Sequence, residues 1–259
     1  MSAGADKVPS LRVLTVNAHQ GLRALRRSGL LSRMRDALRQ TGADVVFLQE
    51  IGVAAGTASP MGQYEVLADT TWPQHAYGRN AVSAGGHHGN ALLSKFPIGR
   101  WENVDASVGH AERRGLLHCV LQVPEFPTAL HAVCVHLALT ESHRRRQVAR
   151  LVALVDGIPA ADPVVIAGDF NDWRERAHRS LVRNLGVEEV HAGPGGRPPR
   201  SFPARFRCLR LDRIYVRNLD YRSISVPREP WARLTDHVPL AADIAWAPAG
   251  RSGSRGSAS

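Results

Sequence analysis

The chain has 259 residues, of which 44% are hydrophobic and 22% are charged, an ordinary composition for a globular protein with a substantial core. The formal net charge of +10 is not ordinary, and it favours a polyanionic partner: nucleic acid, an anionic membrane surface or a phosphorylated substrate. Because nearly all of this charge is arginine, with Lys7 and Lys95 as the only lysines, a GC-rich genome would give the same bias, and charge alone is weak support.

The sequence also disfavours secreted proteins, membrane-spanning proteins and proteins held together by disulfides or zinc. The opening residues "MSAGADKVPS" lack the basic and apolar regions of a secretory signal, and no stretch approaches the roughly 18–20 apolar residues of a membrane span. Cys119, Cys134 and Cys208 are widely spaced and form no CxxC pair, which predicts buried thiols rather than disulfides or a zinc site. We therefore expect a cytoplasmic, monomeric protein.

The two ends are polar and low in complexity, so residues 1–9 and 247–259 are expected to be flexible around one domain at 10–246. Within that domain, strand and helix patterns alternate. Helical spacing of apolar residues predicts helices that end at Gly42 and Gly157, the second of them capped by Thr140. Strands are predicted, in chain order, at "LRVLTVNAH", "DVVFLQE", "GNALLSKFPI", "GLLHCVLQV", "ALHAVCVHL", "PVVIAGDF", "LRLDRIYV" and "VPLAADIAW", the fourth and fifth of them as a hairpin. This mixture implies sheets covered by helices.

Polar residues stand where several apolar runs end. They are Asn17, Glu50, His136, Asp169 and Asn171. Asp and Asn are common turn formers after a strand, so any one of these residues alone reads as a turn. Five such residues favour a shared polar cleft mounted on the sheets.

Two later carboxylates strengthen this interpretation. Asp212 shares a strand face with Ile214 and Val216, where an isolated carboxylate is costly to bury, and His237 is a candidate partner. The stretch "LTDHVPL" adds Asp236 directly before the last strand. Hard oxygen ligands suit Mg²⁺ or Mn²⁺ better than zinc, and such a set fits metal-assisted phosphoryl chemistry.

The ordered motifs "TVNAH", "FLQE", "GNALLSKFP", "CVHL", "IAGDFND", "RLDRIYV" and "TDHVPL" resemble the endonuclease/exonuclease/phosphatase superfamily, the deoxyribonuclease I-like metal-dependent phosphoesterases. The resemblance spans about residues 11–245, and in detail it is closest to bacterial YbhP-like proteins. It implies a four-layer α/β sandwich, two packed mixed β-sheets flanked by helices, with the site at one edge.

The resemblance also implies roles for single residues. Glu50 would be the main metal ligand, with Asn17 and Asp236 beside the metal. Asp169 would orient or deprotonate the attacking water, and Asn171 would bind a phosphate oxygen. His136 would bind phosphate or protonate the leaving group. His237 would be the final histidine of the family, with Asp212 as its partner carboxylate. Asp169 and His237 both remain candidates for the general base.

Other polar residues have weaker support. Asn90 lies in a matched motif and Arg113 offers a planar guanidinium, so both are expected to bind substrate. His87 and His88 line the site or are incidental to a glycine-rich loop. The consecutive arginines 144–146 are expected to be solvated.

Three functions are open. The first is a Mg²⁺- or Mn²⁺-dependent phosphodiesterase that hydrolyses nucleic acid, as an endonuclease or an exonuclease. The second applies the same chemistry to an anionic phospholipid or phosphoinositide headgroup. The third is a catalytically inactive binding module, which the complete set of polar positions disfavours. Only 6% of the residues are aromatic, and no row of them offers stacking platforms for bases.

Overall fold

The structure is a computed structural model that describes residues 10–18, 29–54, 61–109, 113–124, 126–192 and 197–247. Apart from Ala247, the ends that were predicted to be flexible lie outside these residues, so the domain boundaries stay predictions. Within the described part of the chain, no helix is long and apolar enough to cross a membrane.

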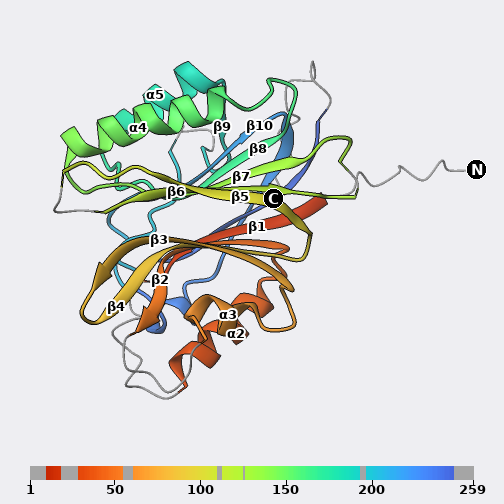
Figure 1. Ribbon diagram of the computed structural model, residues 1–259. Coiled ribbons are helices and arrows are strands. Elements are labelled where there is room, and N and C mark those ends of the chain that lie inside the picture. The colour runs from red at the N-terminus through yellow and green to blue at the C-terminus, as the bar shows by residue number, and fades with distance from the viewer. Residues whose placement is uncertain are drawn as a thin grey trace, which may run out of the picture.

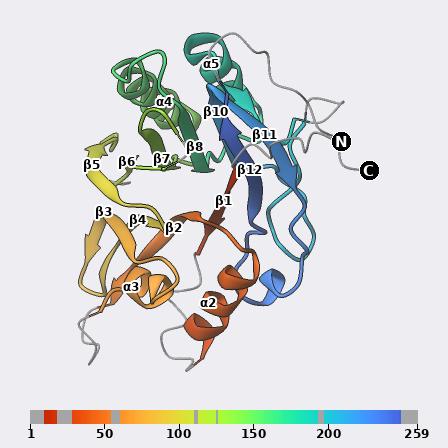
Figure 2. The same ribbon diagram turned by 90° about the vertical axis from the view of Figure 1, so that its right-hand side faces the viewer.

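Two β-sheets are stacked face to face between two layers of helices (Figure 1). Figure 2, which views the sandwich from the side, shows α2 and α3 on the outside of one sheet and α4 and α5 on the outside of the other. The predicted four-layer α/β sandwich is confirmed.

The first sheet has the strand order β11-β12-β1-β2-β4-β3 and is covered by two helices. Its elements are β1 (Ser10–Asn17), α2 (Leu30–Gln40), β2 (Val45–Ala54), α3 (Gln63–Ala68), β3 (Gln74–Ser83), β4 (Gly86–Ser94), β11 (Leu219–Ile224) and β12 (Leu240–Trp246). A short 3₁₀ helix, η2 (Trp231–Arg233), precedes β12.

The second sheet has the order β5-β6-β7-β8-β10-β9. Its elements are β5 (Ile98–Asp105), β6 (Gly115–Leu121), β7 (Leu130–His136), α4 (Glu141–Asp156), β8 (Val164–Asp169), α5 (Arg176–Leu185), β9 (Glu188–Glu189) and β10 (Asp212–Arg217). Strands β6 and β7 pair antiparallel, as the predicted hairpin requires.

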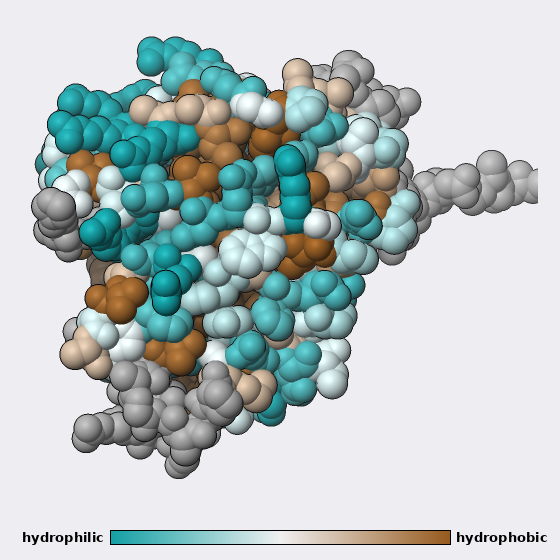
Figure 3. All heavy atoms as spheres, viewed as in Figure 1, coloured by the Kyte–Doolittle hydropathy of each residue, from teal (hydrophilic) through white to brown (hydrophobic). Residues whose placement is uncertain are grey.

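Strand alternation builds the core. In β1, Val13 faces the space between the sheets and Leu14 packs toward α2. In β8, Val165 likewise faces the space between the sheets and Ile166 packs toward α4. Strands that bury both faces read as continuous apolar runs, which is why the sequence revealed them. Figure 3 shows hydrophilic side chains over α4 and α5, on the outside of this core.

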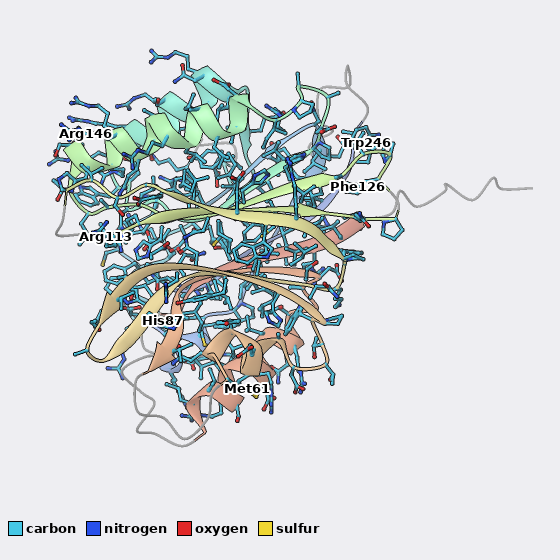
Figure 4. The ribbon with its side chains drawn as sticks, in the orientation of Figure 1. Met61, His87, Arg113, Phe126, Arg146 and Trp246 are labelled. Atoms are coloured by element: carbon cyan, nitrogen blue, oxygen red, sulfur yellow. The ribbon has the colours of Figure 1, made fainter. Side chains whose placement is uncertain are left out.

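The topology brings several strand ends to one edge. Strand β1 runs parallel to β2, and β7 runs parallel to β8, so each pair carries its C-terminal ends to the same side. Trp246 lies at the opposite edge, where β12 ends beside the start of β1. Figure 4 shows Phe126 and Trp246 at that edge, and His87 and Arg113 at the other.

Several details differ from the predictions. Strand β2 does not end at Glu50 but continues to Ala54 past a register shift. Thr140 occupies the N-cap position of α4, but its hydroxyl makes no capping hydrogen bond. Strands β3, β5 and β11 and helices α3 and α5 were not predicted; β5, for example, is an edge strand that is mostly exposed and lacks a long apolar run.

Candidate active site at the edge of the two sheets

The "GDF" turn places a carboxylate at the tip of a rigid strand. Gly168 has φ +150°, and a Cβ there would lie 1.9 Å from the carbonyl oxygen of Val135 in β7. Only glycine permits this close approach of the two strands. Asp169 follows as the last residue of β8 and is buried, so the sheet fixes its backbone.

Both sheets contribute side chains to Asp169. The Asn17 amide, from the end of β1, donates a hydrogen bond to Asp169 Oδ2 over 3.2 Å. Across the strand pair, His136 at the end of β7 holds its Nε2 3.7 Å from the same oxygen. The other carboxylate oxygen, Oδ1, accepts the backbone N–H of Asn171 at 2.9 Å. Asp169 is therefore the centre of a buried polar cluster between the sheets.

Asn171 completes the turn after β8. Its backbone is left-handed, with φ 49°, a conformation that asparagine tolerates better than most residues. Its side-chain amide donates to the carbonyl oxygen of Leu137 at 2.9 Å, which uses one of its two N–H groups.

A buried Asp–His pair faces Asp169. His237 Nδ1 lies 2.8 Å from Asp212 Oδ2, and its Nε2 lies 3.8 Å from Asp169 Oδ2. Asp212 stands opposite Asp169 in the antiparallel pairing of β10 with β8. The predicted partnership of Asp212 with His237 is confirmed. Because Asp212 binds Nδ1, the imidazole presents Nε2 to the centre of the cluster.

Glu50 approaches the cluster from a distorted strand. It has φ 55° and lies within the register shift of β2, between Leu48 and Ile51. Its Oε1 is 3.7 Å from His136 Nε2. A left-handed glutamate within a bulge is a costly conformation, and bulges commonly redirect a side chain beside a functional site.

The protonation states of Asp169 and His237 follow from this arrangement. Burial raises the pKa of Asp169 to about 6, although the nearby His237 charge opposes the shift. Burial alone would lower the pKa of His237, but Asp212, Asp169 and Asp236 together outweigh burial and raise it to about 10. At neutral pH the carboxylate is therefore mostly ionised and the imidazole is charged.

His136 behaves in the opposite way. Burial is the main reason that the pKa of His136 lies well below its ordinary value. The positive charge of Arg114 lowers the pKa further, while Glu50 opposes the shift. The two histidines of the cluster therefore differ, since His136 is neutral and His237 is charged at pH 7.

Not every carboxylate after β8 enters the cluster. Asp172 is buried, and its two oxygens accept the backbone N–H groups of Arg176 and His178 in the first turn of α5. Asp172 therefore stabilises the start of the helix, whereas Asp169 faces the cluster.

Two predicted substrate-binding residues, Asn90 and Arg113, make other contacts than those of the cluster around Asp169. Asn90 is buried between the sheets, and its amide donates to the carbonyl oxygens of Gly115 and Cys134. Arg113 is exposed, and its charge acts on Asp105.

Two predictions were wrong. Arg144 is not solvated: it is 2% exposed, and its guanidinium donates to the carbonyls of Ala138 and Leu139. The position faces inward because α4 packs that side against the loop after β7. Cys208 is not a buried thiol but an exposed one, because it lies in a loop that packs away from the core.

The site also uses residues that the sequence did not single out. Thr235 donates to the carbonyl oxygen of Asn17 at 2.6 Å and accepts the backbone N–H of His237 at 3.3 Å. Ser201 accepts the backbone N–H of Asp212 at 3.3 Å. Thr235 stands in the recognised "TDH" stretch, whereas no local pattern marks Ser201.

The charges of the cluster fit a divalent cation. Four carboxylates gather here, Asp169, Asp212, Glu50 and Asp236, against the charged His237 and the nearby Arg114. Ligand atoms of Asp169, Asp212 and His237 lie within 4.8 Å of one another, but the 2.8 Å bond from Asp212 occupies one imidazole nitrogen. That imidazole nitrogen is therefore not free to bind a cation.

Comparison with known proteins agrees with this geometry. Residues 14–237 match the model of the endonuclease/exonuclease/phosphatase family. The chain is 46% identical over 244 residues to the uncharacterized protein YbhP of Escherichia coli K12, covering 91% of this chain and 96% of that protein.

Solved structures share the fold. The human Nocturnin catalytic domain with a bound sulfate anion superposes with a TM-score of 0.75 at 17% identity, covering 93% of this chain and 96% of that one. An endonuclease/exonuclease/phosphatase from Beutenbergia cavernae gives 0.72 at 20% identity, with 92% and 72% covered. TDP2 from Caenorhabditis elegans gives 0.65 at 16% identity, with 95% and 77% covered. By its sequence and by its architecture, this chain belongs to the endonuclease/exonuclease/phosphatase family of phosphoesterases.

Proposed function

We propose that the protein is a divalent-metal-dependent phosphodiesterase that hydrolyses its substrate by attack of water on phosphorus. The observation that carries this proposal is the buried Asp169, which Asn17 approaches from the other sheet, His136 from the neighbouring strand β7 and His237 from the loop before β12. Such a cluster combines a candidate base with neutral and charged hydrogen-bond donors for phosphate oxygens.

Asp169 is the better candidate for the general base. A base must be unprotonated at working pH, and the pKa of Asp169, which burial raises to about 6, satisfies that condition near neutrality. The pKa of His237, raised to about 10 against the effect of burial by its carboxylate neighbours, keeps the imidazole protonated. Asp169 then removes a proton from water, while the Asn171 N–H that bonds its other oxygen holds the carboxylate in place.

The remaining groups stabilise negative charge on the phosphate. His237, charged and positioned by Asp212, donates through Nε2 to a non-bridging oxygen. Asn171 retains one amide N–H beyond its bond to Leu137 for the same purpose. His136, held neutral, binds phosphate as a hydrogen-bond donor and is the weaker candidate for protonating the leaving group.

Glu50, Asn17 and Asp236 would hold Mg²⁺ or Mn²⁺ through oxygen. When bound, such a cation neutralises the phosphate and acidifies the attacking water. The excess of carboxylates in the cluster is the feature of this chain that fits that role.

Two substrate classes follow. Nucleic acid is the first candidate, because the charge of +10 favours polyanions. The headgroup of an anionic phospholipid or phosphoinositide is the second. It is favoured by exposed apolar side chains close to the site, Leu139 and Trp173 on the loops after β7 and β8 and Phe206 in the loop before β10.

The test is a substrate panel of plasmid, single-stranded DNA, RNA, phosphoinositides and phosphodiester lipids with Mg²⁺, Mn²⁺ or a chelator. We expect hydrolysis of one class with metal and none with chelator. Asp169→Asn controls for contaminating enzymes, and Asp156→Asn, an exposed carboxylate on α4, is the matched control that keeps activity. Turnover that is equal in Asp169→Asn and in the wild type would refute the proposal.

A further inference from the structure

The loop before β10 carries alternating basic and apolar side chains. The segment Arg205–Arg210 reads "RFRCLR", and Phe206 and Leu209 are among the exposed large hydrophobic residues, Phe206 at 78%. Its backbone is ordered: the N–H groups of Phe206 and Arg207 bond the carbonyl oxygen of Pro203, and the Leu209 N–H bonds that of Phe202. A fixed turn thus holds a phenyl ring in water, which costs free energy unless a partner covers the ring.

A basic cavity adjoins this turn. The cavity has a volume of about 350 Å³, and Arg197, Arg200 and Arg207 line it together with His191 and Ser225. Figure 2 shows the connection between β9 and β10, in cyan, running beside β11, whose end forms the far wall of the cavity. Such a cavity is large enough for a phosphate group and offers it guanidinium donors.

The positive charge of this region is not neutralised locally. Among the residues that the structure describes, no carboxylate forms an ion pair with any of the five arginines of the loop and cavity, which are 197, 200, 205, 207 and 210. Burial is the largest cause that lowers the pKa of Arg210. Repulsion from Arg200 and Arg197 lowers it further, while Glu175 opposes the shift. The Nε of Arg207 is buried without a hydrogen-bond partner.

The loop is attached to the candidate active site. The Ala204 N–H donates to the carbonyl oxygen of Asp236 at 2.7 Å, and the ring of Phe202 packs 4.9 Å from that of His237. The apolar side chains of Leu139 and Trp173, 60% and 44% exposed, follow the other catalytic strands. A surface that engages the loop would therefore lie close to the candidate active site.

We propose that the Arg205–Arg210 loop and the adjacent arginine cavity dock the protein on an anionic membrane surface. Phe206 and Leu209 enter the acyl boundary, the arginines extend to the headgroup phosphates, and one phosphate occupies the cavity. A membrane fits better than single-stranded nucleic acid because leucine at 209 and 139 has no aromatic face on which a base can stack. This docking does not require the proposed hydrolysis, since it is a binding property of the loop and the cavity and is measured without turnover.

The test is vesicle flotation with the full chain and a chelator, so that catalysis plays no part. Vesicles of phosphatidylcholine with about one third phosphatidylglycerol should bind the wild type, and pure phosphatidylcholine vesicles should bind it at least roughly 25-fold more weakly. Arg200→Gln with Arg210→Gln should lower the partition coefficient by about 25-fold, since each arginine near such a surface contributes about fivefold. Phe206→Ser should weaken binding by roughly tenfold.

Matched controls remove similar groups elsewhere. Trp101→Ala removes an exposed aromatic residue of β5, and Arg179→Gln with Arg183→Gln removes two arginines of α5; both should bind vesicles like the wild type. Equal losses in control and loop variants would overturn the proposal, because they would show a diffuse charge effect. Absence of vesicle binding, together with binding of a single-stranded oligonucleotide that depends on Phe206, would also overturn it. Circular dichroism confirms that each variant is folded.

Discussion

At the scale of single residues, neighbouring carboxylates have different roles. Asp172 bonds backbone N–H groups of α5 and stabilises a helix start, whereas Asp169, three positions earlier, faces three side chains from other parts of the fold. The chemistry of a carboxylate is thus decided by the elements around it.

Asp169→Asn should reduce turnover by at least roughly 10³-fold, because the amide is no base, and Asn171→Ala should cost about 10²–10³-fold through loss of one oxyanion donor. Asp169→Asn should keep a near-native melting temperature, since it removes one of several buried like charges, whereas Asn171→Ala should lose some stability because alanine tolerates φ 49° less well and the Leu137 carbonyl loses its donor. Turnover and melting temperature are measured on the same preparations. A turn role predicts lost stability with activity kept in the folded fraction.

The buried His237 should give the metal-free protein a measurable dependence of stability on pH. In the folded protein, Asp212, Asp169 and Asp236 raise the pKa of His237 to about 10 despite its burial. The stabilisation that the charged His237 gives to the fold is therefore fully present below the unfolded pKa of about 6.5 and is lost as pH rises toward 10. Urea unfolding in the presence of chelator should show stability declining across that window. His237→Gln should flatten the decline, and Asp212→Asn should move its end to lower pH; an unchanged decline in both would refute the pair.

At the scale of elements, the buried side chain of Arg144 ties α4 to the loops after β7 and β8. The Arg144 guanidinium bonds the carbonyls of Ala138 and Leu139, lies 3.7 Å from Asp172 and stands 5.3 Å from the ring of Trp173. The start of the helix thus holds the loop after β7 against the loop after β8.

Arg144→Met should lower the free energy of unfolding by about 3–5 kcal/mol, because it leaves the buried Asp172 carboxylate without its nearby cation and two carbonyls without their donor. The exposed neighbour Arg145→Met is the matched control and should change stability by no more than about 0.5 kcal/mol. Denaturant titration of both variants measures the difference. Equal, small effects would show that the Arg144 contacts do not stabilise the fold.

At the scale of the whole molecule, the candidate site spans two sheets. Glu50 and Asn17 come from the sheet that contains β1 and β2, whereas Asp169 and His136 come from the other. The proposed metal ligands Glu50, Asn17 and Asp236 are distant in the chain and meet only in the folded protein, so metal binding should couple to global stability.

Mg²⁺ at about 100 times its dissociation constant should stabilise the wild type by roughly 2.7 kcal/mol. Glu50→Gln should lose most of this gain while staying folded without metal, because removal of a charge lowers repulsion in the cluster. Melting temperatures with Mg²⁺ and with chelator, and calorimetric titration of the metal, measure both effects. Unchanged metal affinity in Glu50→Gln would show that another group is the main ligand.

The sequence by itself determined the fold class and most of the candidate site. Strands buried on both faces read as apolar runs, and the polar residues that end them stand out locally, as Asn17, His136 and Asp169 do. These are short-range signals that the chain carries whatever it packs against.

Only the tertiary structure decided what depends on neighbours distant in the chain. The opposite charge states of His136 and His237, the burial of Arg144 and the separate surroundings of Arg113 and Asn90 all arise from residues brought together across the sandwich. The protruding Phe206 is a further case, since exposure is set by what the fold leaves uncovered. Electrostatic and desolvation effects depend on distances between residues that are far apart in the chain, and no short stretch of sequence shows those distances.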